Sequence, residues 1–203
     1  RLRRLTDALS KVDRIIALSA DSATRLRMGG ISAPVDVVAI PVTVPDVGYR
    51  RVIHPNQVVF AGWPSEAKGI EMFRRLSKRQ DLAGVVFTEL SGDMERDDVL
   101  LALADAGVLL VPEQWPNPGP LVVSEAMALG VPVIASDIGG IPETLDNRGR
   151  LVKHDDEEAW ADAITEAVLY DEDNGTSPRN NHVEIRYQIG EVYSNAVRDS
   201  SRG

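Results

Sequence analysis

Short runs of β-branched and apolar residues alternate along the chain with longer segments whose apolar positions recur at helical spacing. The runs predict strands over 12–19, 35–40, 56–62, 83–88, 106–112, 131–136 and 148–153. The segments between them predict helices over 20–29, 69–79, 95–105, 120–129, 155–170 and 183–197. This alternation is typical of a parallel sheet with helices on both faces. The predicted fold class is therefore α/β, with a doubly wound parallel sheet.

Two irregular segments interrupt the pattern. The stretch VTVPDVGYRRVIHPN over 42–56 follows Pro41 and contains two more prolines, which predicts a linker between two lobes. The polar stretch DEDNGTSPRNN predicts a second loop over 171–181. We therefore expect an amino-terminal piece over 1–41, a linker over 42–56, a sheet-centred lobe over 57–181, and a final helix and tail over 182–203.

The composition is that of a globular protein with a sizeable core, since 43% of the 203 residues are hydrophobic. No run of about 18 apolar residues is present to span a bilayer. The start, RLRRLTDALSKVDRII, lacks the features of a secretory signal, so we expect a cytoplasmic protein. The absence of cysteine excludes disulfides and thiolate metal sites. A net charge of −9 argues against nonspecific nucleic-acid binding, because a phosphate backbone is usually met by a basic face.

Polar and glycine-rich residues follow three of the predicted strands. They form the segments GWPSEAKG, PEQWPNPGP and SDIGGIPE, after the strands ending at 62, 112 and 136. Ligands of open parallel sheets bind at the carboxyl ends of the strands, where these segments come together. Gly119 allows the backbone to approach a ligand closely, and Pro120 fits the first helical turn without wasting an N–H. The free N–H groups at that helix start predict an anion site.

Glu125 is a carboxylate inside the otherwise apolar or small-residue helix LVVSEAMALG. It lies about a turn and a half from the helix start, on a face that can look into the crevice. A carboxylate there can accept two hydrogen bonds from adjacent hydroxyls, as the diol of a ribose would offer. The alternative is an ordinary solvent-facing helix residue.

The stretch ADAGVLLVPEQWPNPGPLVVSEAMALGVPVIASDIGGIPETL resembles the donor-binding half of the group 1 retaining glycosyltransferases, which use the two-lobed GT-B fold. The segments RIIALSADSATRLRMGG, VVFAGWPSEAKG and RGRLVKHDDEEAWADAITEAV match in the same order, so the resemblance covers most of the chain. It implies a Rossmann-like carboxyl-terminal lobe with a small remnant of the amino-terminal lobe. It further implies transfer of a hexose, with retention, from a UDP- or GDP-sugar to a glycan, lipid or small-molecule acceptor.

The resemblance gives roles to individual residues. Glu125 would hold the ribose of the donor, and Lys68 would neutralise its diphosphate. Asn117 and Lys68 fall at catalytic positions. The remaining donor-binding positions are Trp63, Thr88, Leu90, Pro118, Gly119, Pro120, Leu121, Gly139 and Gly140. No metal or cofactor is implied, because cationic side chains and helix dipoles can stabilise the leaving diphosphate.

The chain departs from the family pattern in several places. Asn117 stands where the family has its first glutamate, and Trp63 stands where it usually has an arginine. One strand and helix that the family has between 79 and 83 are missing from this sequence. Nearly all of the acceptor lobe is missing as well, and with it the expected contacts to an acceptor and any peripheral contact with a membrane. Apolar surface left on the remnant predicts self-association.

Other interpretations stay open at this point. The departures favour a noncatalytic binding or assembly domain as the main alternative, while the helix around Glu125 argues against a sugar-nucleotide epimerase. Lys68 could be an ordinary loop cation and Asn117 a turn residue. Trp63 is interpreted as a cover over the edge of the core, with stacking on a base or sugar as the alternative. The three histidines lack metal or triad spacing, and Ser124 is not in a nucleophile elbow, so hydrolase chemistry has little support.

Overall fold

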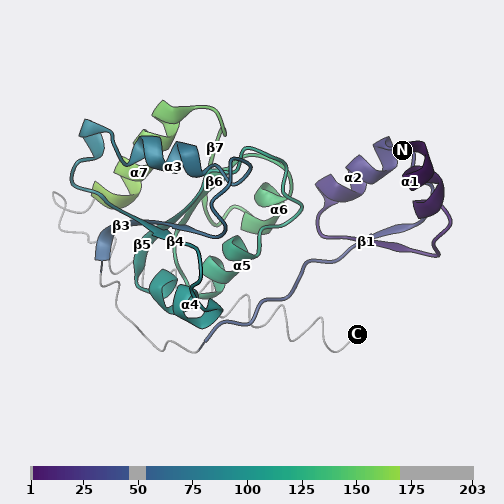
Figure 1. The fold of residues 1–203 in the computed structure, drawn as a ribbon, viewed down its shortest axis with the longest axis horizontal. Coiled ribbons are helices and arrows are strands. Elements are labelled where there is room, and N and C mark those ends of the chain that lie inside the picture. The colour runs from purple at the N-terminus through teal and green to yellow at the C-terminus, as the bar shows by residue number, and fades with distance from the viewer. Residues whose placement is uncertain (1, 46–53, 170–203) are drawn as a thin grey trace.

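A computed structural model describes residues 2–45 and 54–169 (Figure 1). The predicted helix over 183–197, the polar loop over 171–181 and the middle of the predicted linker lie outside the described residues. The described chain forms an amino-terminal unit and a larger lobe built around a sheet. Figure 1 draws the amino-terminal unit beside this lobe, with an extended segment leading from the unit toward it.

The larger lobe contains a five-stranded parallel sheet in the order β4-β3-β5-β6-β7. Its strands are β3 (His54–Ala61), β4 (Val86–Leu90), β5 (Ala106–Val111), β6 (Val133–Ser136) and β7 (Arg150–Val152). Its helices are α3 (Ile70–Leu76), α4 (Arg96–Ala104), α5 (Leu121–Ala128), α6 (Ile141–Leu145) and α7 (Glu157–Leu169), with a 3-10 turn, η1 (Gln80–Leu82), after α3. The predicted doubly wound α/β fold is confirmed.

Alternate residues of each strand enter two different cores, because side chains along a strand point to opposite faces of a sheet. Val58 and Phe60 pack with α3 and α7 on one face, around the buried rings of Phe73 and Trp160. Val59 lies between them in sequence and packs on the other face. That face is covered by α4, α5 and α6. All six residues of β5 are buried, as expected of a central strand with helices on both sides.

The amino-terminal unit contains α1 (Leu2–Leu9), β1 (Ile15–Ala17), α2 (Ala20–Met28) and β2 (Val35–Val37). β1 and β2 form a two-stranded parallel sheet separate from the main one. Ser19 caps α2, since its Oγ accepts from the N–H of Ser22 at 3.2 Å. Two further amides of this helix start, those of Ala20 and Asp21, donate to the carboxylate of Glu143 at 2.6 and 2.7 Å. Glu143 therefore joins α6 of the lobe to the start of α2.

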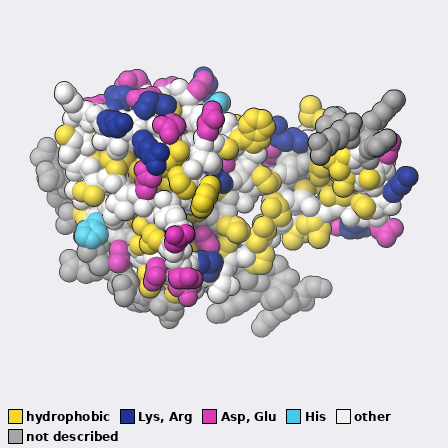
Figure 2. All heavy atoms as spheres, viewed as in Figure 1, with side chains coloured by type: hydrophobic (Ala, Val, Ile, Leu, Met, Phe, Trp, Pro, Cys, Tyr) yellow, Lys and Arg dark blue, Asp and Glu magenta, His cyan; other side chains and the backbone are white. Residues whose placement is uncertain are grey.

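Apolar side chains gather where the amino-terminal unit meets the lobe, as Figure 2 shows. Exposed hydrophobic residues of β1, of β2 and the residues after it, and of α5 include Ile16, Val37, Val38, Ile40 and Leu121. Such surface is compatible with the expected self-association, which stays a prediction.

Several boundaries differ from those predicted. The strands expected over 12–19 and 35–40 are only three residues long. The strand expected over 83–88 begins at Val86, because the N–H of Val85 still bonds to Leu82 O in the turn that ends η1. The short elements η1 and α6, and also α1, were not predicted. η1 and α6 are five residues or shorter, which leaves little periodicity to detect, whereas α1 was missed although Leu2, Leu5 and Leu9 recur at helical spacing.

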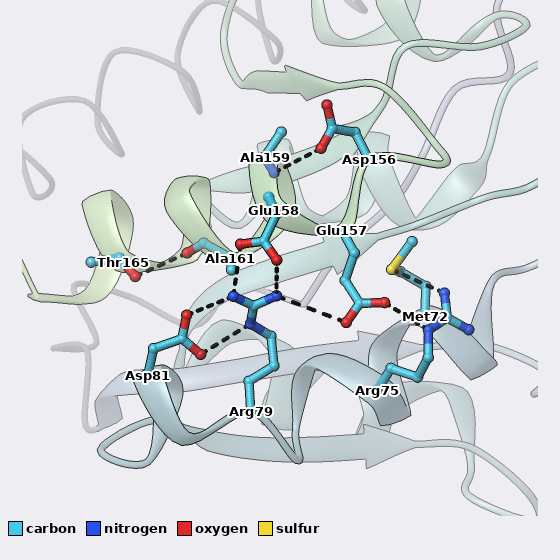
Figure 3. Close-up of polar contacts among 10 residues, drawn as sticks. All are labelled: Met72, Arg75, Arg79, Asp81, Asp156, Glu157, Glu158, Ala159, Ala161 and Thr165. Atoms are coloured by element: carbon cyan, nitrogen blue, oxygen red, sulfur yellow. Dashed lines mark hydrogen bonds and ion pairs between the residues drawn. The ribbon is translucent and has the colours of Figure 1, made fainter.

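An ion-pair network ties the end of α3 to the start of α7 (Figure 3). The guanidinium of Arg79 contacts the carboxylates of Asp81 at 2.7 Å and Glu158 at 2.8 Å. Beside it, Arg75 donates to Glu157 at 2.8 Å. The hydrogen bonds from Arg79 lower the pKa of Asp81 and the pKa of Glu158, because they favour the ionised carboxylates.

We expect Arg79→Gln to lower stability at pH 7, with the difference from wild type shrinking as the pH falls below about 4. Carboxylates whose pKa is lower in the folded state stabilise the fold above their unfolded pKa, and this contribution is lost as they become protonated. Urea denaturation at pH 7 and at lower pH measures the difference. Arg150→Gln is the control, because Arg150 is 61% exposed and lies 3.9 Å from its partner Glu166. If the loss of stability in Arg79→Gln does not change with pH, the ion pairs of Arg79 with Asp81 and Glu158 are not its cause.

Candidate functional site

The chain reverses its direction of travel through the sheet after β4. From β3 it moves outward to β4 at one edge, then returns to the other side of β3 to form β5. The boundary between β3 and β5 is therefore the topological switch point, where ligands of open α/β sheets bind outside the carboxyl ends of the strands. The segments after β3 and β5 are those that the sequence predicted to carry the site.

The loop after β3 lies directly against the loop after β5. Gly69 has a φ of +75°, and a Cβ built there would lie 1.7 Å from Pro112 O, so only glycine fits this contact. The N–H of Gln114 bonds to Ala67 O at 2.9 Å, which fastens the same two loops again. These backbone contacts hold Lys68 over the end of β5.

A hydrogen-bonded cluster links Lys68 to Asn117 through Glu113, a residue that the sequence analysis did not identify. The Glu113 side chain is only 4% exposed, and its Oε1 atom accepts from Lys68 Nζ at 2.6 Å. The same oxygen accepts from Asn117 Nδ2 at 2.8 Å. The available signal was an acid placed directly after a fully apolar strand and a proline. Two predicted residues are therefore brought together by an unpredicted carboxylate.

Asn117 also ties its own loop to the loop after β6. Its Oδ1 accepts from the N–H of Gly119 at 3.1 Å, and its backbone O accepts from the N–H of Gly140 at 2.7 Å. Gly139 has a φ of +63°, and a Cβ there would lie 2.6 Å from Asn117 O. A Cβ on Gly140 would lie 2.1 Å from Pro118 O. The predicted glycines thus allow two backbone segments to touch.

The stretch from Pro118 to Leu121 offers fewer backbone donors than expected. Pro118 and Pro120 have no N–H, and the N–H of Gly119 is already bonded to Asn117 Oδ1. Leu121, the first residue of α5, is the member of this stretch whose N–H lies at the open helix start. Gly119 and Leu121 line a cavity of about 290 Å³ shared with Leu18, Val37, Ala39, Ile40, Ser124, Glu143, Thr144, Asp146 and Arg148.

Glu125 lies on α5 with its side chain 13% exposed, so it is not a freely solvated helix residue. Its Oε1 atom is 2.8 Å from Arg96 Nη2 on α4. The same nitrogen donates to Thr43 O at 2.9 Å. An arginine that is 57% exposed thus connects the predicted ribose acid to the segment that precedes β3. Sequence analysis did not identify Arg96.

The remaining predicted residues lie around this arrangement. Trp63 is 73% exposed, so the interpretation of Trp63 as a cover over the core is wrong. Trp115, on the loop after β5, is 71% exposed as well. Thr88 accepts from Gln57 Nε2 at 2.8 Å in the edge strand. Leu90 is buried, and its backbone O accepts from the N–H of Gly62 at 3.0 Å.

Across residues 2–45 and 54–169, no group of three or more His, Asp or Glu side chains is arranged to hold a metal ion. Within those same ranges, no helix has the length and apolar character needed to cross a membrane.

Comparison with solved structures defines the class of this fold. Sucrose-phosphate synthase from Thermosynechococcus elongatus superimposes with a TM-score of 0.66 over 98% of this chain and 62% of that chain, at 22% sequence identity. HepE from Anabaena in complex with UDP gives a TM-score of 0.67 over 98% of this chain and 67% of that chain, at 18% identity. The lobe has the GT-B architecture that the resemblance implied.

The sequence pattern of the glycosyl transferases group 1 family matches residues 49–181. The chain belongs to this family, which confirms the resemblance. The D-inositol 3-phosphate glycosyltransferase of Saccharomonospora viridis is 31% identical over 199 residues, covering 83% of this chain. The enzyme of the same name from Corynebacterium jeikeium is 32% identical over 124 residues, covering 59% of this chain. The chain spans 45% and 29% of the lengths of these two relatives.

The alignment with the Saccharomonospora protein leaves gaps in this chain. It runs over 199 positions but includes only 83% of the 203 residues of this chain, so the relative has positions without a counterpart here. In the structure, α3 is followed only by η1 before β4 begins at the edge of the sheet.

Proposed function

We propose that this chain is the donor-binding part of a retaining hexosyltransferase that uses a nucleoside diphosphate sugar, with UDP or GDP as the nucleotide. The observation that carries the proposal is the arrangement at the switch point. There a cation, Lys68, follows β3, and a mostly buried acid, Glu125, lies on the helix that follows β5. A diphosphate needs a cation such as Lys68, and a ribose diol can donate hydrogen bonds to an acid such as Glu125. The complexes of the Anabaena neighbour with UDP and UDP-glucose support this choice of donor.

Transfer also requires an acceptor held against the donor in a closed cleft. The acceptor, a glycan, lipid or small molecule, would be bound by a lobe that this sequence mostly lacks. We therefore expect the chain alone to bind the donor with little or no transfer. Mixing the chain with donor and candidate acceptors and measuring released nucleotide tests this expectation, and efficient transfer would contradict it.

A thermal-shift panel tests donor binding directly. The panel contains UDP, GDP, ADP and one hexose conjugate of each. A ligand at 100 times its dissociation constant should stabilise the protein by about 2.7 kcal/mol. A clear rise in melting temperature with one base supports the proposal, and the absence of a shift with every member would overturn it.

The role of Glu125 gives a sharper expectation. If its carboxylate accepts from both ribose hydroxyls, Glu125→Gln should weaken binding of the preferred ribonucleotide by about 1.5 kcal/mol or more, at least tenfold in the dissociation constant. The loss should be much smaller for the 2′-deoxy form, which offers only one of the two bonds. Arg96 competes only modestly, because its guanidinium is 57% exposed and solvent screens its attraction for Glu125.

Isothermal titration of both nucleotide forms against wild type and Glu125→Gln measures this difference. Arg96→Gln is the matched control, because it removes the partner of Glu125 and leaves the acid in place. It should bind the ribonucleotide at least as tightly as wild type. Equal affinities of wild type and Glu125→Gln for ribo and deoxy forms would contradict the ribose assignment.

The second candidate is a noncatalytic binding or assembly domain of the same architecture. It is favoured by Asn117, whose amide bonds to Glu113 and Gly119 and supplies no negative charge. The thermal-shift panel separates the two candidates, since a domain that keeps only the architecture should ignore every nucleotide.

A further inference from the structure

The carboxylate of Glu113 is a buried anion beside the cation of the site. Its side chain is 4% exposed, and a carboxylate removed from water to this extent must be paired or hydrogen-bonded. It receives both kinds of contact, from Lys68 Nζ at 2.6 Å and from Asn117 Nδ2 at 2.8 Å. The ammonium proposed to meet a diphosphate is therefore already neutralised by a fixed protein charge.

The donor and the product of transfer differ in charge next to this pair. In a nucleoside diphosphate sugar, the phosphate that carries the sugar has a single ionisable oxygen. In the free nucleoside diphosphate, the terminal phosphate has a second ionisation near pH 6, so at pH 8 it carries about one more negative charge. A carboxylate fixed behind Lys68 repels this additional charge, and the low dielectric around a buried group strengthens the repulsion.

We propose that Glu113 is a specificity-determining residue that weakens binding of the free nucleoside diphosphate relative to the nucleoside diphosphate sugar. The inference rests on the proposed function, because it takes Lys68 as the residue that meets the diphosphate. Glu113 acts through its charge and through Lys68, since its burial keeps it from the ligand. The consequence for a transferase is that the nucleotide product is released more readily in favour of new donor.

Glu113→Gln tests the charge while keeping the size of the side chain and an oxygen that can accept from Lys68. We expect it to bind UDP about tenfold more tightly than wild type at pH 8, and UDP-glucose no more than about threefold more tightly. Titration calorimetry with the full chain gives both dissociation constants. If the thermal-shift panel prefers another base, the pair is GDP with GDP-mannose or ADP with ADP-glucose.

Three controls keep the test decisive. Glu166→Gln makes the same charge change on α7, away from the switch point, and should leave both affinities unchanged. The nucleoside alone, without phosphate, should bind Glu113→Gln and wild type equally. Glu113→Met removes the charge without adding an amide and replaces Glu113→Gln if that variant folds poorly. It should also lower the dissociation constant of UDP more than that of UDP-glucose. Melting temperatures report the folding of each variant.

Equal gains for UDP and UDP-glucose, or unchanged affinities, would overturn the inference while leaving the proposed function intact. Weaker binding of UDP by Glu113→Gln would also overturn it, because Glu113 would then serve to hold Lys68 in place for the diphosphate. Failure of wild type to bind any nucleotide of the panel would overturn the proposed function, and this inference with it.

Discussion

Gly69→Ala should destabilise the protein by at least about 3 kcal/mol. The backbone at this position has a φ of +75°, which costs an alanine about 1–2 kcal/mol before any contact is considered. The new Cβ would also lie 1.7 Å from Pro112 O, a backbone atom that moves only if the loops after β3 and β5 separate. Urea denaturation followed by circular dichroism measures the loss.

Gly92→Ala is the matched control for this experiment. Gly92 has a φ of +83°, but among the described residues other than its chain neighbours no heavy atom lies within 4 Å of the position a Cβ would take, so alanine there meets only the backbone cost. We expect a loss of about 1–2 kcal/mol. Equal losses for the two variants would show that the loops are not in close contact at Gly69.

Lys68→Ala should have two separate effects. It should lower stability by roughly 2–3 kcal/mol, because Glu113 stays buried and loses its cation. It should also weaken binding of a nucleoside diphosphate about 10 to 100-fold. The effect should be smaller at high salt, because salt screens part of the attraction between Lys68 and the phosphates. Urea denaturation measures the first effect, and titration calorimetry at low and high salt measures the second.

Combining Lys68→Ala with Glu113→Gln separates these effects. The double variant no longer buries an unpaired charge, so it should recover most of the stability lost by Lys68→Ala. It should still bind the diphosphate more weakly than Glu113→Gln, because the hydrogen bond from Lys68 is gone. Equal affinities of the double variant and Glu113→Gln would show that Lys68 does not contact the diphosphate.

The fold was predictable from sequence wherever an element was long and strongly apolar. The strand predicted over 106–112 is β5, and the helix predicted over 120–129 is α5, each displaced by a residue or less. The elements η1 and α6 were missed, and β1 and β2 were overextended, because three to five residues carry little periodic signal. The helix α6 illustrates this, since its five residues begin beside Gly139 and Gly140, which indicate a loop when read alone.

The site was predictable as a set of loops but not as a set of contacts. Residue types at the ends of strands identified the loops that carry Lys68 and Asn117, because parallel strands place their carboxyl ends at one edge of the sheet. The carboxylate that joins them lies 45 positions from Lys68, and Arg96 lies 29 positions from Glu125. Such pairs depend on how α4, α5 and the loops pack in space, which local sequence patterns do not encode. Exposure of Trp63 likewise depends on packing, because tryptophan occurs in cores and on surfaces.

The position of Arg96 makes the proposed ribose site and the segment around Thr43 thermodynamically linked. A single nitrogen, Nη2, donates both to Glu125 Oε1 and to Thr43 O, so a movement of the guanidinium changes both contacts at once. A ligand that draws Glu125 away from Arg96 leaves this nitrogen with Thr43 alone. The linkage is reciprocal. If binding of the ligand changes the equilibrium constant for displacing the segment around Thr43 by some factor, the displacement changes the affinity of the site for the ligand by the same factor.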